Sequence, residues 1–156
     1  MRSGAADGEV LAVLAPILAR GGRESAIDDG MIDHLEHIVL TTARTEQCID
    51  FYTRVLGMTF ERFGEGRMAL KFGGQKINLH EKGREFEPRA TTALPGTLDI
   101  CFIAAVPLAK VIARLAACNV PIIEGPVMKT GARGPIRSVY VRDPDGNLVE
   151  ISEQAV

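Results

Sequence analysis

The amino-acid sequence predicts an α+β fold in which two βαβββ modules form a curved mixed sheet that encloses a cleft. The main observation is the order of its apolar segments, because one strand, one helix and three strands occur twice in succession. Composition agrees, since 46% of the 156 residues are apolar and 24% are charged, the balance of a globular protein. Neither module alone has enough apolar residues for its own core, so the two sheets are expected to associate.

A short apolar strand at residues 37–40 opens the first module, which spans about residues 32–86. Thr45 can cap the helix that follows, whose apolar side chains recur at helical spacing until Gly57 ends it. Three strands separated by glycine-containing turns complete the module: residues 58–63, 68–72 and 76–80.

A linker with a proline near each end leads into the second module, which spans about residues 96–153. Its first strand covers residues 98–103, and the apolar stripe that begins at Leu108 predicts a helix ending at Asn119. Three further strands complete the repeat of the first module: residues 121–123, 137–141 and 148–152.

Residues 1–30 are interpreted as a flexible extension ahead of one domain, residues 31–156. The apolar run in this extension is too short and too interrupted to span a membrane. The formal net charge of −2 gives no field that would attract nucleic acid or an anionic membrane. Three cysteines, an odd number without CxxC spacing, indicate reduced and buried thiols in a cytoplasmic protein.

The tetrapeptide DPDG at residues 143–146 predicts a tight turn near the C-terminus. Pro144 presets φ for this turn, and Gly146 permits the conformation that closes it. The strand that follows is apolar apart from Glu150. Because an unpaired carboxylate on a buried strand is costly, Glu150 requires a cation, a hydrogen-bond network or a metal ion.

Polar residues occupy comparable places on the first and last strands of the two modules. In the first module these are His37 and His80, and in the second they are Asp99 and Glu150. Imidazoles with carboxylates suit a hard or borderline divalent ion, so these four residues are the predicted metal ligands. Asn78 is an alternative to His80, because it aligns with Glu150, whereas His80 has the better donor and faces the same side. A site of three ligands also fits.

Each of these residues can also have a purely structural role. A strand histidine such as His37 is more often a satisfied interior residue than a ligand, and Asp99 can cap a turn. Glu150 can instead pair with Arg137 or Arg142. Only the combined placement of these residues therefore supports a metal site.

A glycine-rich, cationic segment at residues 129–135 is a candidate substrate loop. Lys129 or Arg133 can hold a substrate carboxylate or phosphate as such a loop closes. The alternative interpretation is a solvated hairpin between two strands. Tyr140, on the next strand, either lines the pocket or fills the core.

Taken together, residues 32–153 resemble the vicinal oxygen chelate superfamily, which includes glyoxalase I, bleomycin-resistance proteins and extradiol dioxygenases. Three segments carry the resemblance: HIVL at 37–40, IDFYTRVLGM at 49–58 and DPDGNLVE at 143–150. A nearer likeness is to the branch of glyoxalase domain-containing protein 5 and its bacterial relatives. It rests on five further segments: residues 76–81, 85–88, 95–101, 124–127 and 130–136.

The resemblance implies paired βαβββ modules, a divalent ion (Mn, Ni, Zn, Fe or Mg) and a homodimer in which two chains can share one site. His37 and Glu150 match the ligand places of the family. Asp99 stands where many relatives have histidine, and Asn78 stands where glyoxalase I has glutamate. These two departures argue against glyoxalase I activity itself.

Three functional hypotheses follow. The first is a metal-dependent lyase, isomerase or transferase acting on a small oxygenated molecule, with Glu150 as ligand and catalytic base. The second is a metal-free protein that binds a small molecule, as bleomycin-resistance proteins do. The third is an extradiol-type dioxygenase, in which His37, His80 and a carboxylate hold iron(II).

Overall fold

The computed structural model describes residues 30–155. By its contacts the chain divides into two units, Met1–His34 and Leu35–Val156, and the fold described below is that of the second unit. The extension predicted at residues 1–30 therefore lies outside the described residues, apart from Gly30.

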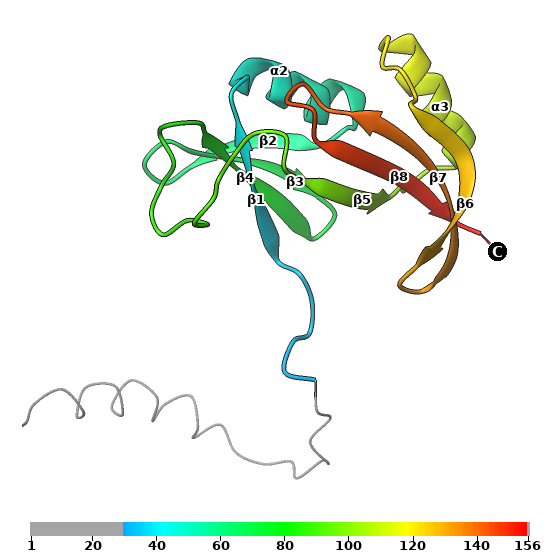
Figure 1. Ribbon diagram of the computed structural model, residues 1–156, viewed down its shortest axis with the longest axis horizontal. Helices are drawn as coiled ribbons and strands as arrows, with labels where there is room; N and C mark the ends of the chain where they lie inside the picture. Colours follow the sequence, from blue (N-terminus) through cyan, green and yellow to red (C-terminus); the bar gives the residue numbers. More distant parts are fainter. Residues whose placement is uncertain (1–29, 156) are drawn as a thin grey trace, which may run out of the picture. The chain divides into compact units, whose positions relative to one another are not determined.

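The first module forms a four-stranded mixed sheet in the order β1-β4-β3-β2 (Figure 1). Strand β1 runs parallel to β4, and the other neighbours are antiparallel. The strands are β1 (His37–Thr42), β2 (Thr59–Phe63), β3 (Arg67–Phe72) and β4 (Gln75–Glu81). All four strands predicted for this module are confirmed, with bounds shifted by one or two residues.

The second module repeats this topology as a sheet in the order β5-β8-β7-β6, with β5 parallel to β8. Its strands are β5 (Asp99–Ile103), β6 (Glu124–Gly131), β7 (Gly134–Arg142) and β8 (Leu148–Gln154). The predicted α+β fold of two βαβββ modules is thus confirmed.

The strand predicted at residues 121–123 is wrong, because β6 begins only at Glu124. Val120 and Ile122 pack against the core from an irregular segment, so their apolar character reflects burial and not a strand. Ile123 makes one bond to β7 ahead of the strand, its N–H donating to the Tyr140 carbonyl at 2.8 Å.

Both predicted helices are present. The first begins at Thr45 as α2 (Thr45–Asp50) and continues as a π-helical turn, η1 (Phe51–Val55). The prediction of Thr45 as the cap is wrong, because Arg44 is the N-cap residue and no side chain caps this helix. Gly57, with φ of 79°, ends this segment as expected. The second helix is α3 (Leu108–Ala117), and the chain leaves it through Asn119, whose φ is 57°.

One apolar cluster joins the two modules. The face of each sheet that meets the helices carries fully buried side chains such as Leu70, Ile77, Val139 and Val149. Because side chains alternate along a strand, the intervening residues lie on the opposite face, called the open face below. The expectation of buried thiols holds for Cys48 alone, since Cys118 is half-buried and Cys101 is exposed on its strand.

Helix α3 is capped by a residue that is distant in the sequence. The carboxylate of Glu153 on β8 accepts the backbone N–H of Leu108 at 2.6 Å and a bond from the Arg137 guanidinium at 2.5 Å. The Leu108 N–H and then Arg137 hold the pKa of Glu153 below its ordinary value. The charge of Glu153 therefore stabilises the folded state above its unfolded pKa, and this contribution is lost as pH falls through the folded pKa.

Glu153→Gln is accordingly expected to lower the urea midpoint of unfolding at about pH 7. The difference in urea midpoint between the variant and the wild type should disappear as the pH is lowered toward about 3, because the wild-type carboxylate is then protonated. Urea titrations across this range measure the effect, with Glu65→Gln in the exposed β2–β3 turn as the matched control. A gap of constant size at every pH would contradict the assignment.

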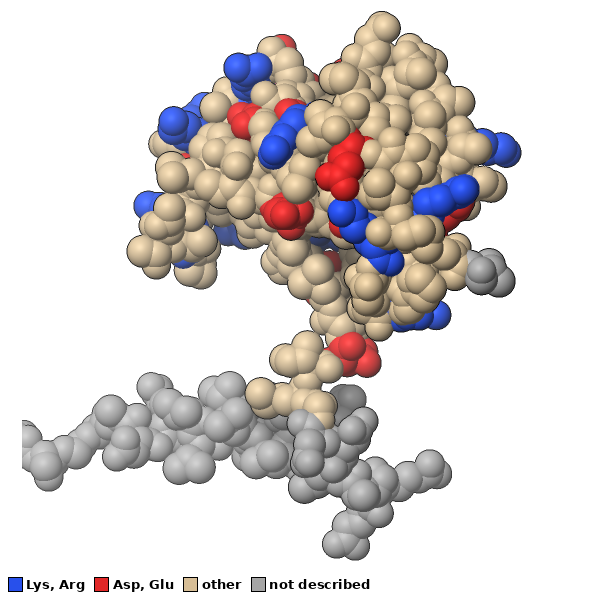
Figure 2. Space-filling model, turned by 45° about the vertical axis from the view of Figure 1, so that its right-hand side comes forward, with Lys and Arg blue, Asp and Glu red and all other residues tan. Residues whose placement is uncertain are grey.

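Within the described residues, no helix is long and apolar enough to cross a membrane. On the face shown in Figure 2, acidic and basic side chains of the described residues are interspersed and neither sign dominates.

Candidate functional site

The two parallel strand pairs place the predicted ligands in matching positions. In the first sheet, Val39 on β1 lies opposite Asn78 on β4. In the second sheet, Cys101 on β5 lies opposite Glu150 on β8. His37 and Asp99 each precede these first-strand residues by two positions and so share their open face. Each sheet thus presents one diagonal pair of polar side chains, His37 with Asn78 and Asp99 with Glu150.

The register distinguishes Asn78 from His80. Thr41 lies opposite His80 in the first sheet, whereas Ile103 lies opposite Ser152 in the second. The structural counterpart of Glu150 is therefore Asn78, and that of His80 is Ser152. The Oδ1 atom of Asn78 and the Nδ1 atom of His80 are both buried and have no hydrogen-bond partner among the described residues.

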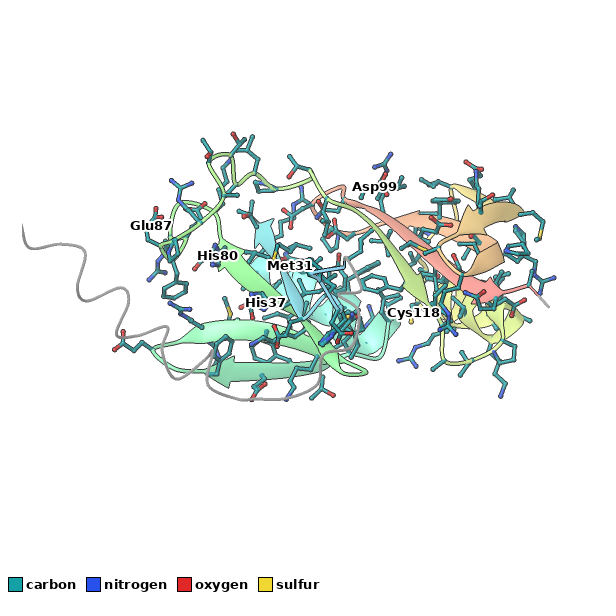
Figure 3. The ribbon with its side chains drawn as sticks, turned by 90° about the horizontal axis from the view of Figure 1, so that it is seen from below. Met31, His37, His80, Glu87, Asp99 and Cys118 are labelled. Atoms are coloured by element: carbon teal, nitrogen blue, oxygen red, sulfur yellow. The ribbon has the colours of Figure 1, made fainter. Side chains whose placement is uncertain are left out.

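The structure does not bring the four predicted ligands together within one chain. Three or more His, Cys, Asp or Glu side chains could hold a metal ion where their ligand atoms lie within 4.8 Å of one another. Among the described residues, no such group contains His37, His80, Asp99 or Glu150. His37 and His80 lie on the first sheet and Asp99 begins the second (Figure 3). The side chain of His37 is 44% exposed and contacts Glu36.

Glu150 lies half-buried among hydroxyl groups. Its Oε1 accepts a bond from Ser152 Oγ at 3.3 Å, and Ser152 Oγ is 2.8 Å from the hydroxyl of Ser138. Desolvation and then a hydrogen bond to Glu150 raise the pKa of Tyr140 to about 12. The phenol of Tyr140 is therefore a protonated donor that can fix the orientation of the Glu150 carboxylate.

Neither Arg137 nor Arg142 pairs with Glu150. Arg137 bonds to Glu153 at 2.5 Å, and Arg142 donates to the carbonyl of Gly146 at 3.0 Å. The compensation of Glu150 that the structure shows is thus a network of neutral hydroxyl donors, which leaves its negative charge available to a cation.

The segment at residues 129–135 is a β-hairpin between β6 and β7, and its turn is formed by Ala132 and Arg133. Lys129 lies within β6, where its Nζ is 3.0 Å from Glu124 Oε1 and 5.2 Å from the centroid of the Tyr140 ring. Lys129 and Tyr140 therefore belong to one neighbourhood with Glu150, whereas Arg133 is exposed at the tip of the hairpin.

Cys48, Asp143 and Asp145 form a cluster in which the potential ligand atoms lie within 4.8 Å of one another. Its oxygens are already occupied. Asp143 Oδ1 accepts the N–H groups of Asp145 and Asn147, and its Oδ2 accepts Asn147 Nδ2 and the Tyr52 hydroxyl. Burial and the charge of Asp143 raise the pKa of the Cys48 thiol to about 12, which disfavours the thiolate a metal needs. The cluster therefore fastens the predicted turn at residues 143–146 to the first module, and it does not fit a metal.

The linker between the modules forms a cavity that the sequence did not predict. About 110 Å³ in volume, it lies between β1, the end of β4 and the linker. Its polar lining residues are Thr41, His80, Arg89, Thr92, Thr97 and Asn147. The arginine in the linker was the only signal, and linker composition alone does not show which strand the linker packs against.

Paired βαβββ modules with matching polar residues on their parallel strands define the vicinal oxygen chelate class. The chain belongs to the Glyoxalase/Bleomycin resistance protein/Dioxygenase superfamily, because the sequence model of that family matches residues 34–151. The resemblance read from the sequence is thus confirmed.

Relatives of this chain include proteins with about half of their aligned residues identical. The glyoxalase domain-containing protein RDO1 of Mycosarcoma maydis is 52% identical over 118 residues, which cover 76% of this chain and 66% of that protein. The virulence protein STM3117 of Salmonella typhimurium is 48% identical over 79% of this chain and 85% of its own length. Its crystal structure superimposes with a TM-score of 0.79 at 47% identity, covering 81% of this chain and all of the other.

A third relative is the integron cassette protein VCH_CASS1 from the mobile metagenome of V. cholerae. It is 49% identical and has a TM-score of 0.79, covering 81% of this chain and 98% of the other. The chain spans slightly less than two thirds of RDO1, all of the STM3117 structure and 98% of the VCH_CASS1 structure.

Proposed function

We propose that this protein is a divalent-metal-dependent enzyme of the glyoxalase superfamily, of lyase, isomerase or transferase type. Its substrate is a small molecule with adjacent oxygen atoms. The observation that carries the proposal is the matched register of the two parallel strand pairs. It gives His37 with Asn78, and Asp99 with Glu150, the same diagonal arrangement on the two open faces.

The donor set fits a divalent ion. One imidazole and two carboxylates suit Mn, Fe, Ni, Zn or Mg to different degrees. The Oδ1 atom of Asn78 is buried without a hydrogen-bond partner, as expected for an oxygen that completes its bonding with a ligand. His80, the alternative ligand to Asn78, lies two residues further along β4.

A divalent ion held by His37, Asp99 and Glu150 would supply Lewis-acid chemistry toward the substrate oxygens. The residues of the chain do the rest. Glu150 accepts and returns a substrate proton, and the Tyr140 hydroxyl orients its carboxylate by donating a hydrogen bond. Lys129, next to Tyr140, supplies positive charge to the substrate, and Arg133 at the hairpin tip is a second candidate for that contact.

The placement of the ligands on two sheets supports a homodimer in which the partner supplies half of the site. His37 lies on the first sheet and Glu150 on the second, and one chain does not bring them into a common group. Apolar side chains accompany them on the open faces: Val39 is 46% exposed and Ile103 is 54% exposed. A second copy would cover these side chains and complete the site.

Elemental analysis of purified protein after dialysis against divalent ions tests the proposal. The wild type is expected to retain about one ion per site, whereas Glu150→Ala and His37→Ala should bind it roughly tenfold or more weakly. Glu61→Ala, which removes an exposed strand carboxylate paired with Lys71, is the matched control and should retain the ion.

Mixing the His37→Ala and Glu150→Ala chains then tests the shared site. A heterodimer of the two variants should regain one competent site, with subunit exchange verified by mass spectrometry. If the wild type and both variants all fail to retain a metal ion, the proposal of a metal-dependent enzyme is contradicted and a metal-free binding protein is favoured. That alternative is favoured by the neutral amide of Asn78 at the counterpart of Glu150. Oxygen consumption with a catechol would instead identify a dioxygenase.

We further propose a cytoplasmic location, which the three free cysteines support.

A further inference from the structure

The cavity beside the first sheet has the features of a binding site for a small anion. It is lined by strand residues of the open face and by the linker, which passes over the end of β4. Figure 3 shows His80 on its strand with Glu87 of the linker on the same side of the molecule. At about 110 Å³ the cavity is smaller than a site for a drug-sized ligand, so it admits only a short molecule or one end of a larger one.

His80 supplies a fixed and unsatisfied polar atom to this cavity. His80 is only 8% exposed, and its Nδ1 atom has no hydrogen-bond partner among the described residues. The ring is held against Phe86 with 5.9 Å between ring centroids, and the Arg67 guanidinium lies 5.0 Å from the Phe86 centroid. A buried nitrogen held in this way is an expected contact for a ligand.

Arg89 supplies the charge. Its Nε donates to Glu87 Oε1 at 3.0 Å and its Nη1 donates to the Ala90 carbonyl at 3.3 Å. These bonds orient the guanidinium and leave Nη2 without an acceptor within residues 30–155. No aspartate or glutamate is among the described residues that line the cavity. Arg89 is the charged group of the lining and its Nε is paired with Glu87 outside the lining, so its Nη2 is the donor left for an anion.

We propose that His80 and Arg89 bind the carboxylate of the substrate, and that the substrate class is a short oxygenated carboxylic acid. The threonine hydroxyls can bond to the carboxylate, and Val39, Leu94 and Leu98 provide an apolar wall for a short carbon chain. A phosphate, polar on every side, suits this wall less well.

The cavity lies beside the strand position of Asn78. His80 follows Asn78 by two residues on one face of β4, a separation of about 7 Å along the strand. A carboxylate on His80 and Arg89 therefore leaves the adjacent oxygens of a short acid within reach of the Asn78 side of the site. This assignment of substrate class rests on the proposed function, whereas binding of the carboxylate does not require the metal.

Isothermal titration of EDTA-treated full-length protein with lactate tests the proposal. Lactamide, of the same shape but without charge, is the matched probe, and inorganic phosphate is the competing anion. Arg89→Gln and His80→Gln are each expected to weaken lactate binding at least tenfold. Arg84→Gln is the control, because Arg84 contacts Glu81 and does not line the cavity.

Lactate binding that exceeds lactamide binding, and that is lost in Arg89→Gln but kept in Arg84→Gln, supports the subsite. Unchanged binding in Arg89→Gln, equal binding of lactamide, or tighter binding of phosphate overturns it. Loss of metal in His80→Gln, with folding verified by its thermal midpoint, would also overturn it by making His80 a metal ligand. Because the protein is metal-free in the titration, failure of the metal proposal alone leaves the lactate result intact.

Discussion

Asp143→Ala is expected to lower the free energy of unfolding by about 3–5 kcal/mol. Asp143 is 5% exposed and accepts four hydrogen bonds, two from backbone N–H groups and two from the side chains of Asn147 and Tyr52. Its removal leaves these donors unsatisfied, some of them in the core, and disconnects the turn from the first module. Urea denaturation followed by circular dichroism measures the change.

Asp50→Ala is the matched control for this prediction. Asp50 is a carboxylate on α2 that makes a bidentate contact with Arg54, but its side chain is 51% exposed. Exposed pairs of this kind contribute little to stability, because water and salt screen the charges. Equal losses in the two variants would contradict the assignment of Asp143 as the residue that joins the modules.

The second large effect is expected at Gly125, where replacement by alanine should destabilise the protein by about 4 kcal/mol or more. Gly125 has a φ of 111°, and a Cβ atom there would lie 2.5 Å from the Ser138 carbonyl oxygen and 2.9 Å from the Val139 Cα. Both contacts are with the backbone of a central strand, which cannot move aside without disturbing the sheet.

Gly134→Ala separates the clash from the backbone strain. Gly134 begins β7 with a similar φ of 122°, but a Cβ atom there would meet nothing within 4 Å. Its replacement should therefore cost only the strain, about 1–3 kcal/mol. Thermal and urea unfolding of both variants give the comparison, in which failure of Gly125→Ala to fold agrees with the clash and equal losses exclude it.

Local sequence patterns predicted most of the fold, because each helix, strand and turn depends mainly on residues that are close together in the sequence. Glycine at position 57 ended the first helical segment, and the DPDG turn closed as expected, with the Gly146 N–H donating to the Asp143 carbonyl at 3.0 Å. The strand at residues 121–123 was predicted wrongly, because a short apolar run can serve a loop that packs on the core as readily as a strand.

The candidate site was predictable only in part. The sequence by itself determined the order of the elements, the family and the strands that carry His37, Asp99 and Glu150, because these follow from local periodicity and motifs. The sequence also aligned Asn78 with Glu150, and the strand register agrees with that alignment. Only the tertiary structure decided that Asp143 joins the modules and that the linker makes a cavity over His80. The physical reason is that strand register and burial depend on contacts between residues far apart in the chain, which no local pattern encodes.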